Sequence, residues 1–229
     1  MTDAVSDSPR PRPSPVRLAF WFLLVLTVSA LEYQARFSGA SSSKATRNEV
    51  YSYSAFANTL VFYALILGVV LAIAYDRADL LALRRPLVRR ALAVGAGVLV
   101  AVFAWELVVS YLPVRSPGSE QGLTPTGWEP AHAGAFAANV VLFACIAPFV
   151  EELTFRGVGQ SLLRAFGRVP SILGIGVMFG IWHGLVEALL VLIPFGVALA
   201  YLRDRTRSVV PGMVVHGLFN AIALVLSVV

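Results

Sequence analysis

Residues 135–157 read AFAANVVLFACIAPFVEELTFRG, an apolar run that ends in two adjacent glutamates and an arginine. A helix that crosses a bilayer needs about 20 mostly apolar residues, so this run is long enough to span one. Neighbouring residues of a helix point in different directions, whereas residues four apart share a face. The spacing therefore predicts that Glu152 pairs with Arg156, which leaves Glu151 free to point elsewhere.

The composition is that of a membrane protein. The chain has 229 residues, of which 58% are hydrophobic and only 14% are charged, against about 25% in an average soluble domain. We expect the formal net charge of +5 to set the membrane topology. No nucleic acid is expected as a partner, because basic and aromatic residues are not interleaved. The predicted fold class is all-α, a polytopic membrane protein with about seven transmembrane helices.

Three regions follow from the distribution of polar and apolar sequence. Residues 1–16, rich in Pro, Ser and Arg, predict a disordered cytoplasmic tail. Residues 17–134 predict N-terminal transmembrane helices and loops, and residues 135–229 predict a C-terminal helix bundle that contains the active site. The expected spans cover residues 17–33, 55–75, 91–112, 135–150, 171–186, 188–202 and 209–228, and the fourth helix is expected to continue through the charged motif.

Arginine-rich stretches predict the orientation. The N-terminus and the segments 76–90, 156–168 and 203–207 are basic, and basic segments remain in the cytoplasm. We therefore expect the N-terminus inside and the C-terminus outside. The first span is also compatible with a cleaved signal peptide, because Val28-Ser29-Ala30 resembles a cleavage site, but we favour an uncleaved span.

Several polar residues lie inside the expected spans, where ionisable groups are costly and usually paired or functional. His183 follows Phe179 by four residues, and His216 precedes Asn220 by four, so each pair shares a helix face. A carbonyl-bonded core histidine and an interhelical hydrogen bond are the structural explanations. A carboxylate, two imidazoles and an amide are also the parts of a site that activates water for hydrolysis. Other acids, namely Glu32, Glu106 and Glu187, are interpreted as segment-end residues.

Three motifs occur in order on successive hydrophobic segments. EELTFR fits E-E-x-x-x-R, FGIWH fits F-x-x-x-H, and HGLFN fits H-x-x-x-N. Together they resemble the CPBP family over residues 135–229, a family that includes the CAAX prenyl endopeptidases and the bacterial Abi-type membrane proteases. The resemblance implies an intramembrane endopeptidase. It implies a catalytic site of Glu151, His183, His216 and Asn220, supported by Glu152, Arg156 and Phe179.

The resemblance leaves the chemistry and the substrate open. We favour a metal-free reaction in which Glu151 activates water, and the alternative is a divalent metal, zinc, bound by Glu151, His183 and His216. The expected partners are the lipid bilayer and a membrane-anchored or lipidated protein or peptide. Processing of a CAAX sequence, of a C-terminal sorting signal or of a bacteriocin fits, in a cytoplasm-facing cavity of an integral protein of the bacterial plasma membrane.

Two rival functions and one geometric difficulty remain at this stage. A transporter or proton relay also places acids and histidines in membrane helices, although no internal repeat is visible. A non-catalytic immunity or scaffold protein is the other rival. The difficulty is the depth of the two histidines. At 1.5 Å per residue, His183 lies about 20 Å along its helix from Pro170, whereas His216 lies about 12 Å into its span from the basic linker 203–207. A single site therefore needs the fifth span to start late or tilt, or residues 171–202 not to form two full crossings.

Overall fold

The computed structural model describes residues 14–38, 49–114, 120 and 127–228. Within these residues the fold consists of helices, with no strand. Residues 1–13 of the predicted tail lie outside the described part, and Pro15 and Val16 already belong to the first helix, so the predicted tail is too long. Ser14 begins that helix because its side-chain oxygen accepts a hydrogen bond from the backbone N–H of Arg17.

The long helices agree with the apolar segments of the sequence. They are α1 (Pro15–Phe37), α2 (Tyr53–Ile73), α3 (Val88–Ser110), α8 (Arg168–Trp182), α9 (Leu189–Thr206) and α10 (Val210–Leu226). Short 3₁₀ turns precede or follow them at η2 (Glu49–Tyr51), η3 (Ala78–Leu81), η4 (Pro130–His132) and η7 (Arg164–Phe166). The expected basic linker 203–207 is corrected, because α9 continues to Thr206 and the chain turns at Arg207, which has a positive φ of 57°.

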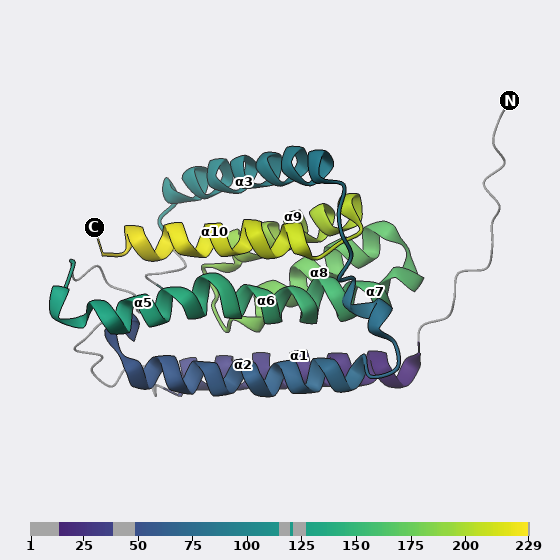
Figure 1. Cartoon of the computed structure of the whole chain (residues 1–229), viewed down its shortest axis with the longest axis horizontal. Coiled ribbons are helices and arrows are strands. Elements are labelled where there is room, and N and C mark those ends of the chain that lie inside the picture. The colour runs from purple at the N-terminus through teal and green to yellow at the C-terminus, as the bar shows by residue number, and fades with distance from the viewer. Residues whose placement is uncertain (1–13, 39–48, 115–119, 121–126, 229) are drawn as a thin grey trace, which may run out of the picture.

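The charged motif lies on one long central helix, as the sequence predicted. This helix passes without interruption through α5 (Ala133–Val141), η5 (Leu142–Ile146), α6 (Ala147–Glu152), η6 (Leu153–Gly159) and α7 (Gln160–Leu163). Its two η segments are π-helical, and such wider turns are often found at functional sites. Figure 1 shows the central helix between the α1–α2 pair on one side and α8, α9 and α10 on the other, with α3 outermost.

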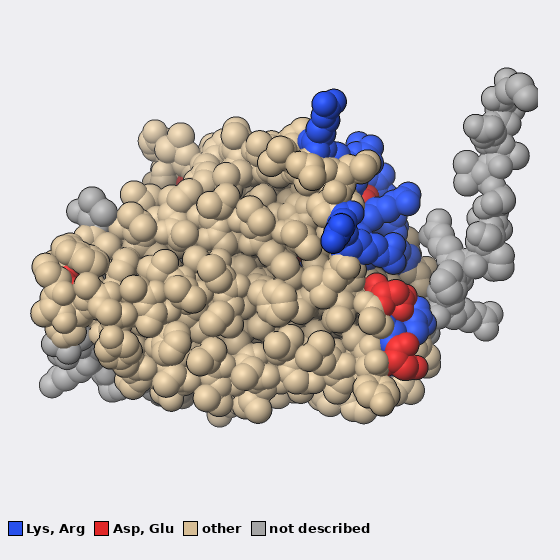
Figure 2. All heavy atoms as spheres, in the orientation of Figure 1, with Lys and Arg blue, Asp and Glu red and all other residues tan. Residues whose placement is uncertain are grey.

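The helices suit a protein embedded in a membrane. Four of them are long and apolar enough to cross a bilayer: Pro15–Phe37, Tyr53–Ile73, Val88–Ser110 and Pro130–Phe166. Arg168–Trp182 and Val210–Leu226 are apolar but shorter. The protein is thus an all-helical integral membrane protein, and the number of seven crossings stays a prediction. On the face shown in Figure 2, Lys and Arg side chains gather at one end of the molecule, where α1 and α10 begin.

The first helix is an integral part of the bundle. The Trp21 side chain is fully buried, and its indole Nε1 donates a hydrogen bond of 2.9 Å to the carbonyl of Thr154 in the central helix. A Cβ atom at Gly159 would lie 2.4 Å from the Trp21 ring, so only glycine admits the indole there. This packing ties α1 to the helix that carries the charged motif, and the uncleaved first span stays a prediction.

Two glycines let α8 and α9 approach closely. A Cβ atom built on Gly196 of α9 would lie 2.9 Å from both the Cα and the carbonyl oxygen of Gly176 in α8. Backbone atoms cannot move aside as a flexible side chain can. Small residues at such crossings are the usual way in which membrane helices gain packing contacts. The α8–α9 hairpin therefore depends on the absence of side chains at this crossing.

Glu120 and its partners Arg36, Val186 and Ala188 form a clamp, which holds the turn between α8 and α9 at the end of the molecule opposite the arginine-rich end. The buried Glu120 carboxylate accepts hydrogen bonds from the backbone N–H groups of Val186 (2.8 Å) and Ala188 (2.7 Å), and it pairs with Arg36 of α1 at 2.5 Å. Burial alone would raise the pKa of Glu120, but these N–H groups and the Arg36 charge outweigh it and hold the pKa below its ordinary value. The ionised carboxylate thus fixes the start of α9.

The glycine crossing predicts a specific loss of stability. Gly196→Ala should lower the free energy of unfolding by about 1–3 kcal/mol, because the added methyl group overpacks the α8–α9 contact. Thermal unfolding of the purified protein in detergent measures the change. Gly97→Ala is the matched control, since a Cβ atom at Gly97 has no neighbour within 4 Å. Equal melting temperatures for the two variants would contradict the packing argument.

The clamp predicts a pH-dependent stability. The native pKa of Glu120 is lowered, so the stabilisation is complete above the ordinary glutamate value of about 4.3 and is lost as the pH falls through the native pKa. Wild type should therefore be more stable than Glu120→Gln near neutral pH, with a difference that disappears in acid. Melting temperatures measured from pH 7 downward test this. Glu49→Gln, a substitution of an exposed glutamate in η2, should show no such convergence, and a constant gap for Glu120→Gln would disprove the clamp.

Candidate active site

A buried polar network joins the central helix to α9 and α10. The predicted Glu152–Arg156 pair is present, with Nη1 of Arg156 2.9 Å from Oε1 of Glu152 and both side chains inaccessible to solvent. The second guanidinium nitrogen donates to the carbonyl of Gly196 at 3.0 Å. The guanidinium also lies 4.3 Å from the centroid of the Phe179 ring, within the range of a cation–π contact. Arg156 thereby links three helices.

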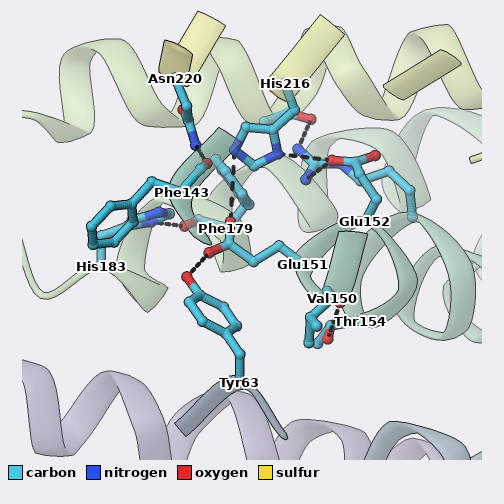
Figure 3. A network of polar contacts seen from close by, with 12 residues as sticks. Tyr63, Phe143, Val150, Glu151, Glu152, Thr154, Phe179, His183, His216 and Asn220 are labelled. Atoms are coloured by element: carbon cyan, nitrogen blue, oxygen red, sulfur yellow. Dashed lines mark hydrogen bonds and ion pairs between the residues drawn. The ribbon is translucent and has the colours of Figure 1, made fainter. Parts of the chain in front are cut away.

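Glu152 has a second partner that sequence reasoning missed. Nδ1 of His216 lies 3.3 Å from the same Oε1 atom, as Figure 3 shows. A carboxylate oxygen accepts and does not donate, so Nδ1 of His216 carries the hydrogen. In the neutral imidazole the other nitrogen, Nε2, is then an acceptor. No periodicity links residues 152 and 216, and only the packing of α10 on α6 brings them together.

Glu151 points away from this pair, as predicted, but it is not free. The hydroxyl of Tyr63 in α2 donates a hydrogen bond of 2.5 Å to Oε1 of Glu151. The other oxygen, Oε2, lies 3.8 Å from Nε2 of His216, which is too long for a hydrogen bond. Oε2 is buried and makes no hydrogen bond within the described part of the chain. The prediction is therefore correct for the direction of Glu151 and wrong for its lack of a partner.

His183 occupies the end of α8 and not a position deep within it. The helix ends at Trp182, and Nδ1 of His183 donates to the carbonyl of Phe179 at 2.8 Å, since a carbonyl only accepts. This leaves Nε2 as the available acceptor of the neutral ring. The side chain turns back by one helical turn toward the start of α8, which reduces the depth difference from His216. The two imidazoles then meet the same ring, Phe179, at centroid distances of 4.8 and 5.6 Å.

Asn220 takes the structural role that the sequence left open. Its amide nitrogen donates to the carbonyl of Phe143 in η5 at 2.9 Å, which fixes α10 to the central helix. The amide has two hydrogens, so one donor remains after this bond. Asn220 and His216 are not among the residues that line the cavity described next. The structure thus places Asn220 one turn beyond His216, with its amide on the carbonyl of Phe143, a residue that lines the cavity.

A cavity of about 360 Å³ opens beside Glu151 and His183. Aromatic rings form part of it: Phe62, Phe143 and Trp182. The remaining lining is polar and comes from the first two helices, with Glu32 from α1 and Asn58, Thr59 and Tyr63 from α2. Glu32 is therefore a cavity residue, which corrects its interpretation as a segment-end residue. Sequence reasoning also missed Tyr63, because one tyrosine in an apolar span carries no motif.

The candidate metal ligands are not grouped as a metal site requires. Among the described residues, no set of three or more His, Cys, Asp or Glu side chains is placed to hold a metal ion. His216 directs Nδ1 to Glu152, and Glu151 is bound by Tyr63 on one oxygen. These contacts leave Nε2 of His216 and Oε2 of Glu151 unengaged, but the set of Glu151, His183 and His216 is not grouped as a metal site within the described residues, so no reaction step is assigned to a metal.

The part of the chain that carries the three motifs is similar to a known protein family. Residues 133–222 match the family described as Rce1-like, type II CAAX prenyl endopeptidase. Neither the curated proteins nor the solved structures contain a match to the chain. The matched region includes all the motif residues. It excludes α1 and α2, and therefore Tyr63. With the three motifs in order on buried helices, this match makes residues 133–222 similar to the core of a membrane-embedded CAAX-type endopeptidase.

Proposed function

We propose that the protein hydrolyses a peptide bond in a membrane-anchored or lipidated substrate, using water that Glu151 activates. One observation carries this mechanism. The Oε2 atom of Glu151 is buried beside the cavity, is unpartnered among the described residues, and faces Nε2 of His216 at 3.8 Å. Two acceptor atoms at this distance suit a water molecule that donates to one of them. Such a water has the position that a general base requires.

The side chains can account for each proton that moves during the reaction. Glu151 takes a proton from water as the oxygen attacks the substrate carbonyl, and it returns the proton to the leaving amine as the carbon–nitrogen bond breaks. His183 orients the attacking water through Nε2, because its Nδ1 is committed to Phe179. His216 holds its hydrogen on Nδ1 toward Glu152, so its Nε2 helps to orient the attacking water and takes no proton. The second amide hydrogen of Asn220 is the candidate donor for the oxyanion.

The substrate and its location are extensions of the family assignment. A CAAX-type substrate is the first choice, because residues 133–222 match the CAAX prenyl endopeptidases. Processing of a C-terminal sorting signal or of a bacteriocin-type peptide uses the same chemistry and remains an alternative. We place the protein in a bacterial plasma membrane with its N-terminus and its arginine-rich end in the cytoplasm, on the argument that basic segments stay inside.

Loss of the Glu151 carboxylate should abolish proteolysis. Glu151→Gln keeps the size of the side chain but removes the base, so we expect cleavage to fall by about 10²–10⁴-fold. Sequencing of peptide termini in membrane fractions of cells that contain wild type or the variant measures this. Glu106→Gln in α3 controls for the loss of an acid in a span. An unchanged set of termini would overturn the protease, and activity that survives chelators in metal-free buffer would exclude the zinc alternative.

Tyr63 should act through Glu151. Tyr63→Phe keeps the ring in the cavity but removes the hydrogen bond to Oε1, so the carboxylate loses its fixed direction. We expect kcat to fall about tenfold while KM changes less than about twofold, because the interaction orients the base and does not bind substrate. Tyr51→Phe, which removes a hydrogen bond to the carbonyl of Gly127, is the matched control. A change in KM alone would show that Tyr63 contacts substrate instead.

A further inference from the structure

One wall of the cavity lies outside the region that matches known proteases. Glu32 of α1 and Asn58 and Thr59 of α2 line the same cavity as Glu151 and His183. The family match begins at residue 133 and does not reach them. Charged and strongly polar side chains are rare in membrane helices unless they face a partner or a polar cavity. The polar side chains of this wall therefore indicate a ligand that they can bind through charge and hydrogen bonds.

The residues of this wall lie toward the end of the molecule that is opposite the arginine-rich end. At 1.5 Å per residue, Glu32 lies about 8 Å before the end of α1, and Asn58 about 8 Å after the start of α2. Tyr63, which contacts Glu151, lies about 15 Å along α2. The cavity therefore extends from Glu151 and His183 toward the end opposite the arginines. This differs from the cytoplasm-facing cavity expected from the sequence, if the arginine-rich end is cytoplasmic.

Glu32 presents a negative charge that the described chain does not neutralise. Its side chain is exposed, and no described residue forms an ion pair with it. The next cation along α1, Arg36, is held by Glu120. The main chain around Glu32 is held by tight packing against Gly184. The two residues are so close that a Cβ atom added at Gly184 would lie only 2.6 Å from Cβ of Glu32. The carboxylate is thus set on a rigid helix in the lining of the cavity.

The chemistry of this wall selects a cation. An ionised carboxylate attracts a positive group and repels a negative one, and the effect is larger where protein and lipid exclude water. The Asn58 amide and the Thr59 hydroxyl each donate and accept hydrogen bonds, so they can complete the contacts of an ammonium or guanidinium group. A cavity of about 360 Å³ has the size of a small ligand site and admits a short peptide segment.

We propose that Glu32, Asn58 and Thr59 form a substrate subsite that binds a lysine or arginine side chain close to the bond that is cleaved. This subsite rests on the proposed peptidase function, because it shares its cavity with Glu151. A free C-terminal carboxylate is disfavoured in the same place, since it would meet the charge of Glu32. The subsite therefore selects peptides by charge at one position, independently of any lipid group on them.

A charge-swap experiment tests the subsite. The full chain is placed in nanodiscs of zwitterionic lipid, which do not themselves attract cations. The probes are eight-residue peptides of Ala and Leu that are anchored to the bilayer by an N-terminal acyl chain and have a blocked C-terminus, and one Lys, Gln or Glu is moved through each position. Binding is measured with Glu151→Gln, and cleavage with wild type. At one position Lys should bind about fivefold more tightly than Gln, as expected for a partly exposed ion pair.

The variants decide between the possible results. Glu32→Gln should remove the preference for Lys, Glu32→Lys should transfer it to Glu, and Glu106→Gln should leave it unchanged. Cleavage without any charge preference, or a preference that survives Glu32→Gln, overturns the subsite while the protease stands. A Glu32-dependent preference in binding without cleavage by wild type supports the subsite and overturns the protease. The absence of both binding preference and cleavage overturns both proposals.

Discussion

The Glu152–Arg156 ion pair, buried completely at the centre of the bundle, is the interaction on which the other elements depend. Removing two charges from water costs several kcal/mol per ion, so such a pair persists only when every partner is well placed. Here the carbonyl of Gly196 and Nδ1 of His216 add to its contacts, while Oε2 of Glu152 and Nε of Arg156 make no hydrogen bond within the described structure. Because these groups come from α9 and α10, the charge requirement of one helix fixes the position of two others.

Glycine makes this arrangement sterically possible. A Cβ atom at Gly212 of α10 would lie 2.4 Å from Oε2 of Glu152, so the carboxylate fits only against a bare backbone. At Gly217, five residues further along α10, a Cβ atom would lie 2.3 Å from the carbonyl oxygen of Ala144. Close backbone approach places His216 over the carboxylates. The active-site geometry is thus a consequence of helix packing, and not of a dedicated loop.

The two adjacent glutamates divide the work because of where their helix places them. Glu152 faces α9 and α10, where it is neutralised and orients His216. Glu151 faces α2 and the cavity, where Tyr63 holds one oxygen and leaves the other unpartnered within the described structure. Figure 3 shows His216 between the two carboxylates, with Glu151 also directed toward Tyr63. The two neighbouring carboxylates therefore lie near opposite nitrogens of the same imidazole, and each has a second partner of its own.

The sequence by itself determined the features that depend on local spacing and composition. Apolar runs predicted the helices, the four-residue interval predicted the Glu152–Arg156 pair, and three motifs predicted the protease family. Only the tertiary structure decided which distant side chains meet these residues. Tyr63 and Glu32 lie on helices that carry no motif, and the contact of Glu152 with His216 joins two helices far apart in sequence. Contacts between helices leave no period in the sequence, because they arise from packing angles and close backbone approach.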